Sequence, residues 1–252
     1  MPIIAVANQK GGVGKTATVA NLGAALAQAG RSVLLVDLDP QANLCLSCGL
    51  TPAPGQPTAY DVLMDDATAA HAAILPTRWE HLAILPGTEA LAAAQVQMAH
   101  LAGRNLLLRH KLRPLRGYDF ILVDTPPSLG FLTLNALAAA DWVLIPVQAS
   151  FLALHGLRQL TQIVASVREH SNPDLRIGGI LLTMYDPRTL HAQQVYERLR
   201  QHYGKTVFET LVRRSVAFDY ATVAGEPLVF HRPTHACSQT YHQLAQEVIT
   251  RA

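Results

Sequence analysis

The stretch QKGGVGKT, residues 9–16, lies between an apolar run and a segment rich in alanine and leucine. The apolar run, residues 3–7, predicts a buried strand, and residues 16–29 predict a helix that ends at Gly30. A glycine-rich loop between a strand and the N-terminus of a helix suits phosphate binding, because its backbone N–H groups converge on one anion. The sequence therefore predicts an α/β domain that binds a nucleotide.

Residue types within this loop indicate how the phosphates would be held. Lys15 is spaced to reach the β- and γ-phosphates, and the Thr16 hydroxyl is spaced to ligate Mg²⁺. The residues expected to contact the nucleotide are Lys10, Gly11, Gly12, Val13, Gly14, Lys15, Thr16 and Ala17.

The loop also departs from the ordinary phosphate-binding motif. Gln9 stands where that motif has its first glycine, and Lys10 adds a second lysine. This deviant Walker A pattern resembles that of the ParA/MinD group of ATPases, which implies ATP and Mg²⁺ as cofactors. In that group the extra lysine crosses a dimer interface to the partner subunit's nucleotide, so the resemblance gives Lys10 and Lys15 catalytic roles. Two lysines this close repel each other unless an anion lies between them, which favours a phosphate-facing role for Lys10.

Two further apolar runs end in carboxylates. Residues 33–36 lead into Asp37 and Asp39, and residues 120–123 lead into Asp124. A strand interior would bury both Asp37 and Asp39 at high cost, so we expect these two to emerge at the carboxyl end of their strand, where ligands of open α/β sheets bind.

The patterns D-x-D-P-Q and D-T-P-P around these carboxylates resemble those of the same family. The resemblance implies that Asp39 positions the attacking water, and that residues 125–128 form a switch around the terminal phosphate. The metal site that it implies comprises Thr16, Asp37, Asp39 and Asp124.

Strand and helix patterns alternate along the rest of the chain. The further strands are expected at residues 82–85, 142–147 and 177–183, and the further helices at residues 88–113, 129–139, 154–170 and 189–203. The chain has 252 residues, 50% of them hydrophobic, which is enough for one large core. We predict a doubly wound, mostly parallel twisted sheet flanked by helices, a single P-loop ATPase domain over residues 1–252 without an N-terminal helix-turn-helix domain.

Two arginine-bearing segments in the C-terminal part extend the resemblance. One matches the family segment whose arginine contacts DNA, which gives that role to Arg188. The other matches imperfectly: Arg213 replaces a proline, Tyr220 replaces an acid, and Ala217 stands where several relatives have an arginine. The resemblance implies DNA binding by Arg188, Arg213 and Arg214, against the alternative that these are ordinary surface arginines.

The resemblance as a whole implies a partitioning ATPase. Such a protein forms an ATP-sandwich homodimer, binds DNA nonspecifically, and hydrolyses ATP slowly until a ParB-like partner stimulates it. Its cargo is a chromosome, a plasmid or a protein complex, and the motifs leave that choice open. The chain lacks the pattern of a signal peptide, so we expect a cytoplasmic, nucleoid-associated protein.

Two other functions are compatible with the same phosphate-binding loop. A MinD-like membrane ATPase needs a C-terminal amphipathic helix with a basic face, but Arg251 is the only Lys or Arg in residues 236–252, so we expect no membrane binding. A metabolic enzyme of the same fold needs a substrate pocket or cluster ligands. Cys45 and Cys48 form a CxxC pair that invites a redox or cluster role, but with one other cysteine in the chain we favour simple packing.

Overall fold

The computed structural model describes residues 1–99, 101 and 103–251, and the side chains of all of these except residues 151–155. Over this part of the chain, eight strands form one sheet in the order β3-β4-β2-β5-β1-β6-β7-β8. The strands are β1 (Ile3–Val6), β2 (Val33–Asp37), β3 (Leu75–Pro76), β4 (Leu82–Leu85), β5 (Phe120–Asp124), β6 (Trp142–Gln148), β7 (Arg176–Tyr185) and β8 (Val207–Arg213). All neighbouring pairs are parallel except β3 with β4, which confirms the predicted fold class.

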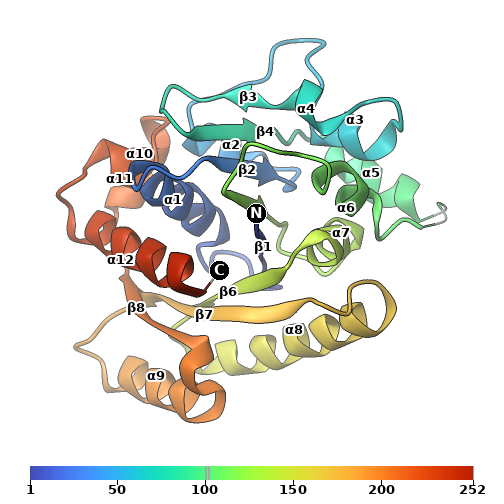
Figure 1. Cartoon of the computed structure of the whole chain (residues 1–252). Helices are drawn as coiled ribbons and strands as arrows, with labels where there is room; N and C mark the ends of the chain where they lie inside the picture. The colour runs from blue at the N-terminus through green and yellow to red at the C-terminus, as the bar shows by residue number, and fades with distance from the viewer. Residues whose placement is uncertain (100, 102, 252) are drawn as a thin grey trace.

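Helices cover both faces of the sheet (Figure 1). They are α1 (Lys15–Gln28), α2 (Asn43–Ser47), α3 (Ala59–Met64), α4 (Ala70–Ala73), α5 (Leu91–Met98), α6 (Leu107–Leu112), α7 (Phe131–Ala139), α8 (Phe151–His170), α9 (Leu190–Tyr203), the 3₁₀ turn η1 (Gly204–Thr206), α10 (Ala217–Val223), α11 (Leu228–His231) and α12 (Ala236–Arg251). Helices α3 to α9 pack on one face, and α1, α2, α11 and α12 pack on the other.

The central strand shows why the sheet has two cores. In β1, Ile3 and Ala5 join the core on the α7 side, whereas Ile4 and Val6 join the core on the α1 side. All four are fully buried, because successive side chains of a strand point to opposite faces and helices cover both.

The topology brings the predicted site residues to one edge. β1 lies between β5 and β6, so the strand order reverses on its two sides, and the loop after β1 opens at this switch point. Val6 is in register with Asp124, and Asp124 is in register with Asp37. The phosphate-binding loop and these carboxylates therefore share the carboxyl edge of the sheet.

One predicted helix was wrong. Residues 88–113 were expected to form a single helix, but α5 and α6 are separate, and part of the turn between them lies outside the described residues. Gly103 in that turn has a φ of 68°, which a right-handed helix cannot include. The other predicted strands are confirmed as β1, β2 and β4 to β7, and the other predicted helices as α1, α7, α8 and α9.

Candidate functional site

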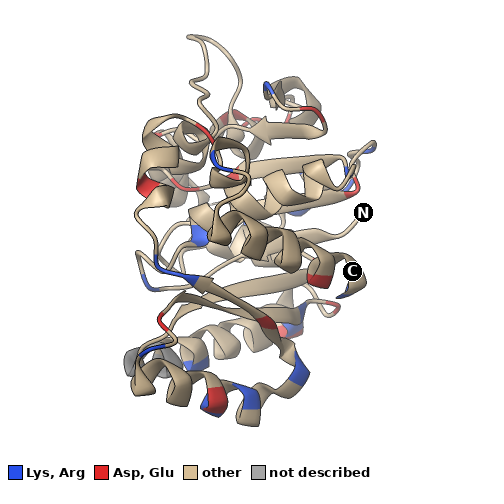
Figure 2. Ribbon diagram, turned by 90° about the vertical axis from the view of Figure 1, so that its left-hand side faces the viewer, with Lys and Arg blue, Asp and Glu red and all other residues tan. Residues whose placement is uncertain are grey.

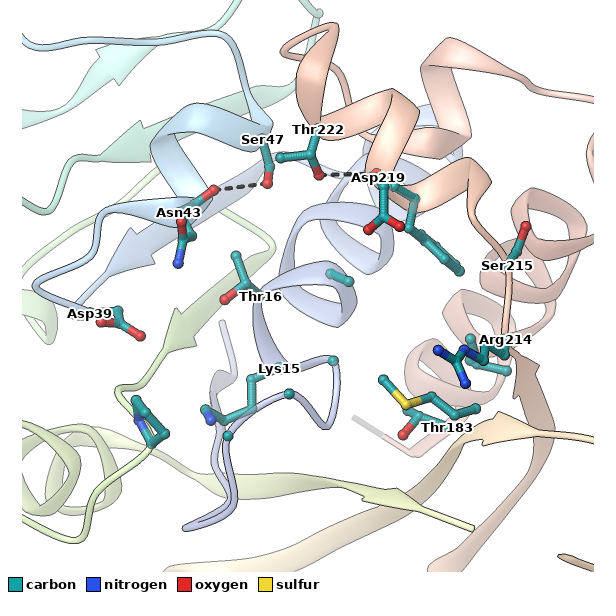
Figure 3. Close-up of a pocket in the computed structure, with 18 of the residues that line it drawn as sticks. Lys15, Thr16, Asp39, Asn43, Ser47, Thr183, Arg214, Ser215, Asp219 and Thr222 are labelled. Atoms are coloured by element: carbon teal, nitrogen blue, oxygen red, sulfur yellow. Dashed lines mark hydrogen bonds between the residues drawn. The ribbon is translucent and has the colours of Figure 1, made fainter.

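A cavity of about 570 Å³ opens at the carboxyl edge of the sheet (Figure 3). The phosphate-binding loop forms one wall, the ends of β7 and β8 form another, and α2 and α10 close the far end. Six of the residues predicted to contact the nucleotide line this cavity: Gly11, Gly12, Gly14, Lys15, Thr16 and Ala17. Among the described residues, the lining does not include Lys10 or Val13.

Glycine is required at two positions of the loop by its backbone. Gly12 has a φ of 70° and Gly14 a φ of 84°, in the left-handed region that other residues enter only with strain. Helix α1 begins directly after Gly14, so its free N–H groups face the cavity. This geometry suits an anion, as the sequence predicted.

Lys15 is a buried cation at the base of the cavity. Its side chain points into the space beside Thr16, and the residue is only 7% exposed (Figure 3). Its ammonium donates one long hydrogen bond, 3.4 Å, to the carbonyl of Lys10. Burial lowers the pKa of Lys15, while the charges of Asp124 and Asp39 act in the opposite direction. A phosphate in the cavity would satisfy this cation more fully than the protein does.

Asp124 is the carboxylate that the protein leaves unsatisfied. It is fully buried, and neither oxygen has a hydrogen-bond partner among the described residues. Burial is the largest cause that raises its pKa, and the charge of Asp37 adds to it, while the Thr16 hydroxyl and Lys15 act against both. A buried carboxylate without partners costs free energy, which a bound cation would offset.

These oxygen donors fit Mg²⁺. In the described part of the chain, no group of three or more His, Cys, Asp or Glu side chains could hold a metal by itself. Mg²⁺ is usually bound through one or two carboxylates together with substrate phosphates and waters, so a hydroxyl at Thr16 and a carboxylate at Asp124 suffice.

Asp37 and Asp39 lie at the carboxyl end of β2 as expected, but both are buried, so the expectation that this position would spare them burial was wrong. Asp37 is fully buried at the end of β2, and its two oxygens accept hydrogen bonds from the backbone N–H groups of Asp39 and Cys45, at 3.1 and 3.2 Å. These bonds make the burial tolerable, although desolvation still raises the pKa of Asp37 to about 6. Asp39 accepts from the N–H of Gln41 at 3.0 Å and lines the cavity. Asp37 therefore braces the loop, whereas Asp39 faces the ligand space.

The cysteines of the CxxC pair lie in the core beneath this loop. Cys45 and Cys48 are 2% and 3% exposed and belong to the apolar cluster on the α1 face. Burial raises the pKa of both thiols, that of Cys48 to about 12. Reactive cysteines have lowered pKa values and some exposure, so the structure supports packing over a redox role.

Lys10 is held outside the cavity. It is exposed, its N–H donates to Asn8 Oδ1 at 3.0 Å, and its ammonium donates to Gln148 Oε1 at 3.1 Å. Asn8 in turn donates to the carbonyl of Pro146 at 2.7 Å. The side chain is thus attached to the end of β6, at the surface where another molecule could meet it.

The three predicted DNA-binding arginines come together beside the nucleotide cavity. Arg188, Arg213 and Arg214 all line a second cavity of about 770 Å³. Arg213 and Arg214 also line the first cavity, and they share this dividing wall with Met184 and Ser215. Figure 2 shows the other basic residues dispersed among acidic ones over the ribbon, with several in the lower part around α9.

Sequence reasoning missed several residues of the cavity. Thr183 and Met184 at the end of β7 line it, as do Phe218, Asp219 and Thr222 on α10. Met184 has a φ of 52°, unusual for a residue other than glycine. The only sequence signal for these residues was their closeness to Arg188 and to Arg213 and Arg214 in the chain.

Comparisons with known proteins agree with this geometry. The AAA domain family matches residues 1–177. The chain is 43% identical to the sporulation initiation inhibitor protein Soj of Bacillus subtilis, over 98% of this chain and 97% of that protein. It is 47% identical to the chromosome-partitioning ATPase Soj of Thermus thermophilus, over 98% and 95% of the two chains.

A solved structure gives a further match. The Mycobacterium smegmatis protein named cobyrinic acid a,c-diamide synthase, solved with ADP and magnesium, superposes with a TM-score of 0.85 at 37% identity. The match covers 99% of this chain and 94% of that one.

Proposed function

The chain belongs to the ParA/Soj family of partitioning ATPases, and we propose that it is a DNA-binding switch driven by ATP binding and hydrolysis. The observation that carries this proposal is the buried Asp124 carboxylate, which is close enough to Lys15 and Thr16 for both to lower its pKa and lies at the same edge of the sheet as the glycine loop. A magnesium nucleotide would supply a cation for Asp124 and an anion for Lys15, whose hydrogen bond to the Lys10 carbonyl is long.

Mg²⁺ and the phosphates would be held by different atoms of the same loop. Thr16 and Asp124 would hold the metal, with Asp37 and Asp39 supporting its surroundings, and the loop N–H groups with Lys15 would hold the phosphates. When bound, Mg²⁺ neutralises charge that develops on the transferred phosphoryl group. The M. smegmatis relative, which is solved with ADP and magnesium, supports this assignment.

Hydrolysis would be slow without help. Asp39 lines the cavity with one oxygen already bonded to Gln41, so it can orient a water but is a weak base. Lys15 would stabilise charge on the terminal phosphate. Lys10 would leave Gln148 and reach the nucleotide of a second copy, which makes the active form an ATP-bound homodimer.

The arginine cluster would bind DNA through its phosphates. Arg188, Arg213 and Arg214 line one cavity, and two of them also border the nucleotide cavity, so nucleotide occupancy and DNA contact meet at a common wall. Phosphate contacts carry no sequence information and weaken steeply with salt. A dimer presents the cluster twice, which raises DNA affinity when ATP joins two subunits.

A ParB-like partner would stimulate hydrolysis and release the protein from the nucleoid. The cargo would be a chromosome, a plasmid or a protein complex, positioned in the cytoplasm. The relative named a chromosome-partitioning ATPase supports the partitioning role.

One observation favours a second candidate, an ATP-dependent synthase. The M. smegmatis relative carries the name of such an enzyme. A synthase would consume ATP only with its carboxylic acid substrate, whereas a partitioning switch would consume it faster with DNA and a partner protein. A membrane-associated switch is a third outcome to test; none of the described helices is both long and apolar enough to cross a bilayer.

The test is to measure molecular mass by light scattering with Mg²⁺-ATP, with Mg²⁺-ADP and without nucleotide, followed by pelleting with duplex DNA or with anionic phospholipid vesicles. We expect a mass near twice 27.3 kDa with ATP alone, and pelleting with DNA but not with vesicles. Unchanged mass with ATP, or pelleting with vesicles alone, would refute the proposal.

A further inference from the structure

Arg188 is not free in this structure, because a neighbouring carboxylate binds it. Its Nε donates to Asp186 Oδ1 at 2.9 Å, and its Nη2 donates to Asp186 Oδ2 at 2.8 Å. The backbone N–H of Arg188 also donates to Asp186 Oδ1, at 3.0 Å. Asp186 therefore occupies the guanidinium in the two-pronged geometry that a phosphate would use.

The ion pair between Asp186 and Arg188 is open to solvent, so another anion can replace the carboxylate. The Arg188 side chain is 87% exposed and the Asp186 side chain 37% exposed, and an ion pair in water holds only weakly. Hydrogen bonds from Arg188 lower the pKa of Asp186 to about 2, so the carboxylate stays charged at neutral pH. A phosphate reaching Arg188 must displace this carboxylate or approach it against charge repulsion.

The position of Asp186 in the second cavity is a further observation. Asp186 and Arg188 line the cavity that Arg213 and Arg214 also line, and Arg213 is near enough to lower the Asp186 pKa further. Asp186 is the only acidic residue among the described residues of that lining. Of the charges around the cavity, it is the one that opposes a polyanion.

We propose that Asp186 is an internal substitute for a DNA phosphate. Its carboxylate binds the Arg188 guanidinium and lowers the DNA affinity of the three arginines until a DNA phosphate displaces the carboxylate. The inference rests on the proposed DNA binding, and it adds a specific residue that limits that binding. If Asp186 weakens DNA binding by the monomer, ATP-dependent dimerisation produces a larger increase in DNA affinity than it would without Asp186.

The test is Asp186→Asn, which removes the charge but keeps an oxygen that can accept from the Arg188 N–H. The matched control is Asp174→Asn, which removes an exposed carboxylate near the opposite end of β7. Binding to random-sequence duplex DNA is measured for both and for the wild type, in a salt series, with ATP, with ADP and without nucleotide. Both substitutions are also made in an Arg188→Ala background.

We expect Asp186→Asn to tighten DNA binding more than Asp174→Asn does, and without nucleotide as well as with ATP. Because DNA displaces Asp186 from Arg188 in the wild type as well, both proteins make the same phosphate contacts once bound. The slope of log affinity against log salt should therefore stay close to that of the wild type, while the affinity rises at every salt concentration. The advantage over Asp174→Asn should vanish when residue 188 is alanine.

Three results would overturn the inference: weaker binding by Asp186→Asn, a gain no larger than that of Asp174→Asn, or a gain that persists without Arg188. These are distinct from failure of the proposed function. If neither the wild type nor Asp186→Asn binds DNA in any nucleotide state, both proposals fail. If the wild type binds and Asp186→Asn binds equally, only the masking role fails.

Discussion

The Thr183 hydroxyl donates a hydrogen bond to the Val13 carbonyl at 2.9 Å, which ties the end of β7 to the phosphate-binding loop. Both residues are buried, and they lie 170 positions apart in the chain. The next residue, Met184, lines both the cavity beside the phosphate-binding loop and the second cavity, which is also lined by Arg188, Arg213 and Arg214. One hydrogen bond and one peptide link therefore connect the phosphate-binding loop to the wall that the two cavities share.

Replacing Thr183 by valine tests this connection. Thr183→Val keeps the side-chain shape but leaves the Val13 carbonyl without this donor, so we expect the free energy of unfolding to fall by about 1–3 kcal/mol. Nucleotide affinity should fall by up to about tenfold, which corresponds to roughly 1.4 kcal/mol. Denaturant unfolding and nucleotide titration measure the two effects. Thr183→Ser retains the hydroxyl and should retain affinity; equal losses in both variants would show that the bond is irrelevant.

The buried carboxylates predict how stability depends on pH. The pKa values of Asp37 and Asp124 are raised above the ordinary 3.8, that of Asp37 to about 6. The folded chain thus binds more protons than the unfolded chain in this range, so the free energy of unfolding should fall as pH rises from about 4 through 6 and beyond. Denaturant unfolding without nucleotide or metal, at a series of pH values, measures this.

Asp124→Asn should flatten that dependence and stabilise the nucleotide-free protein at pH 7, by about 1.4 kcal/mol for each unit of pKa shift removed. It should also abolish stabilisation by Mg²⁺-ATP. Asp174→Asn, which removes an exposed carboxylate, should leave the pH dependence intact. If the stability of Asp124→Asn depends on pH in the same way as that of the wild type, Asp124 does not contribute to the pH dependence.

Two glycines in contact join the walls of the cavity. Gly225, after α10, has a φ of 67°, and a Cβ added there would lie 2.8 Å from Gly49 Cα, after α2. Gly225→Ala should destabilise the fold by about 2–5 kcal/mol, the sum of about 1–2 kcal/mol for a left-handed alanine and about 1–3 kcal/mol for an overpacked contact. Gly55→Ala is the control, since its φ is 79° but a Cβ there would meet no described atom within 4 Å. Thermal or denaturant unfolding of both variants separates the two contributions, and equal losses would mean that the contact with Gly49 adds nothing.

Lys10 should matter for assembly rather than for nucleotide binding by one subunit. Its ammonium is attached to Gln148 outside the cavity, so Lys10→Ala removes no contact from the cavity lining. We expect monomers to bind ATP within about twofold of the wild type, since no lost interaction approaches 1.4 kcal/mol, while the ATP-dependent dimer is lost. Light scattering and nucleotide titration measure the two. Lys205→Ala, at an exposed lysine before the amino end of β8, should still dimerise; dimerisation by Lys10→Ala would disprove the proposed crossing.

The sequence predicted the strands that carry the site, because their patterns are local. β1, β2 and β5 are short, buried and largely apolar. β2 and β5 end in Asp37 and Asp124, and β1 leads into the phosphate-binding loop. β8 was missed because it is an edge strand with exposed Glu209 and Arg213 among its buried residues. β3 was missed because it has only two residues.

The missing parts of the site depend on contacts that no local pattern encodes. Thr183 meets Val13 through the packing of β7 against the loop, and contacts with α2 and α11 hold α10 against the cavity. The burial of Asp37 was mispredicted for the same reason. Its compensating donors are backbone N–H groups whose positions come from the turn and from the start of α2.

The central claim is that ATP switches this protein onto DNA. The direct measurement is equilibrium binding to random-sequence duplex DNA with Mg²⁺-ATP, with Mg²⁺-ADP and without nucleotide, each over a salt series. The account predicts binding that is tightest with ATP, that falls steeply as salt rises, and that Arg188→Glu weakens without preventing dimerisation. Binding of equal strength in all three nucleotide states, or none in any, would contradict it.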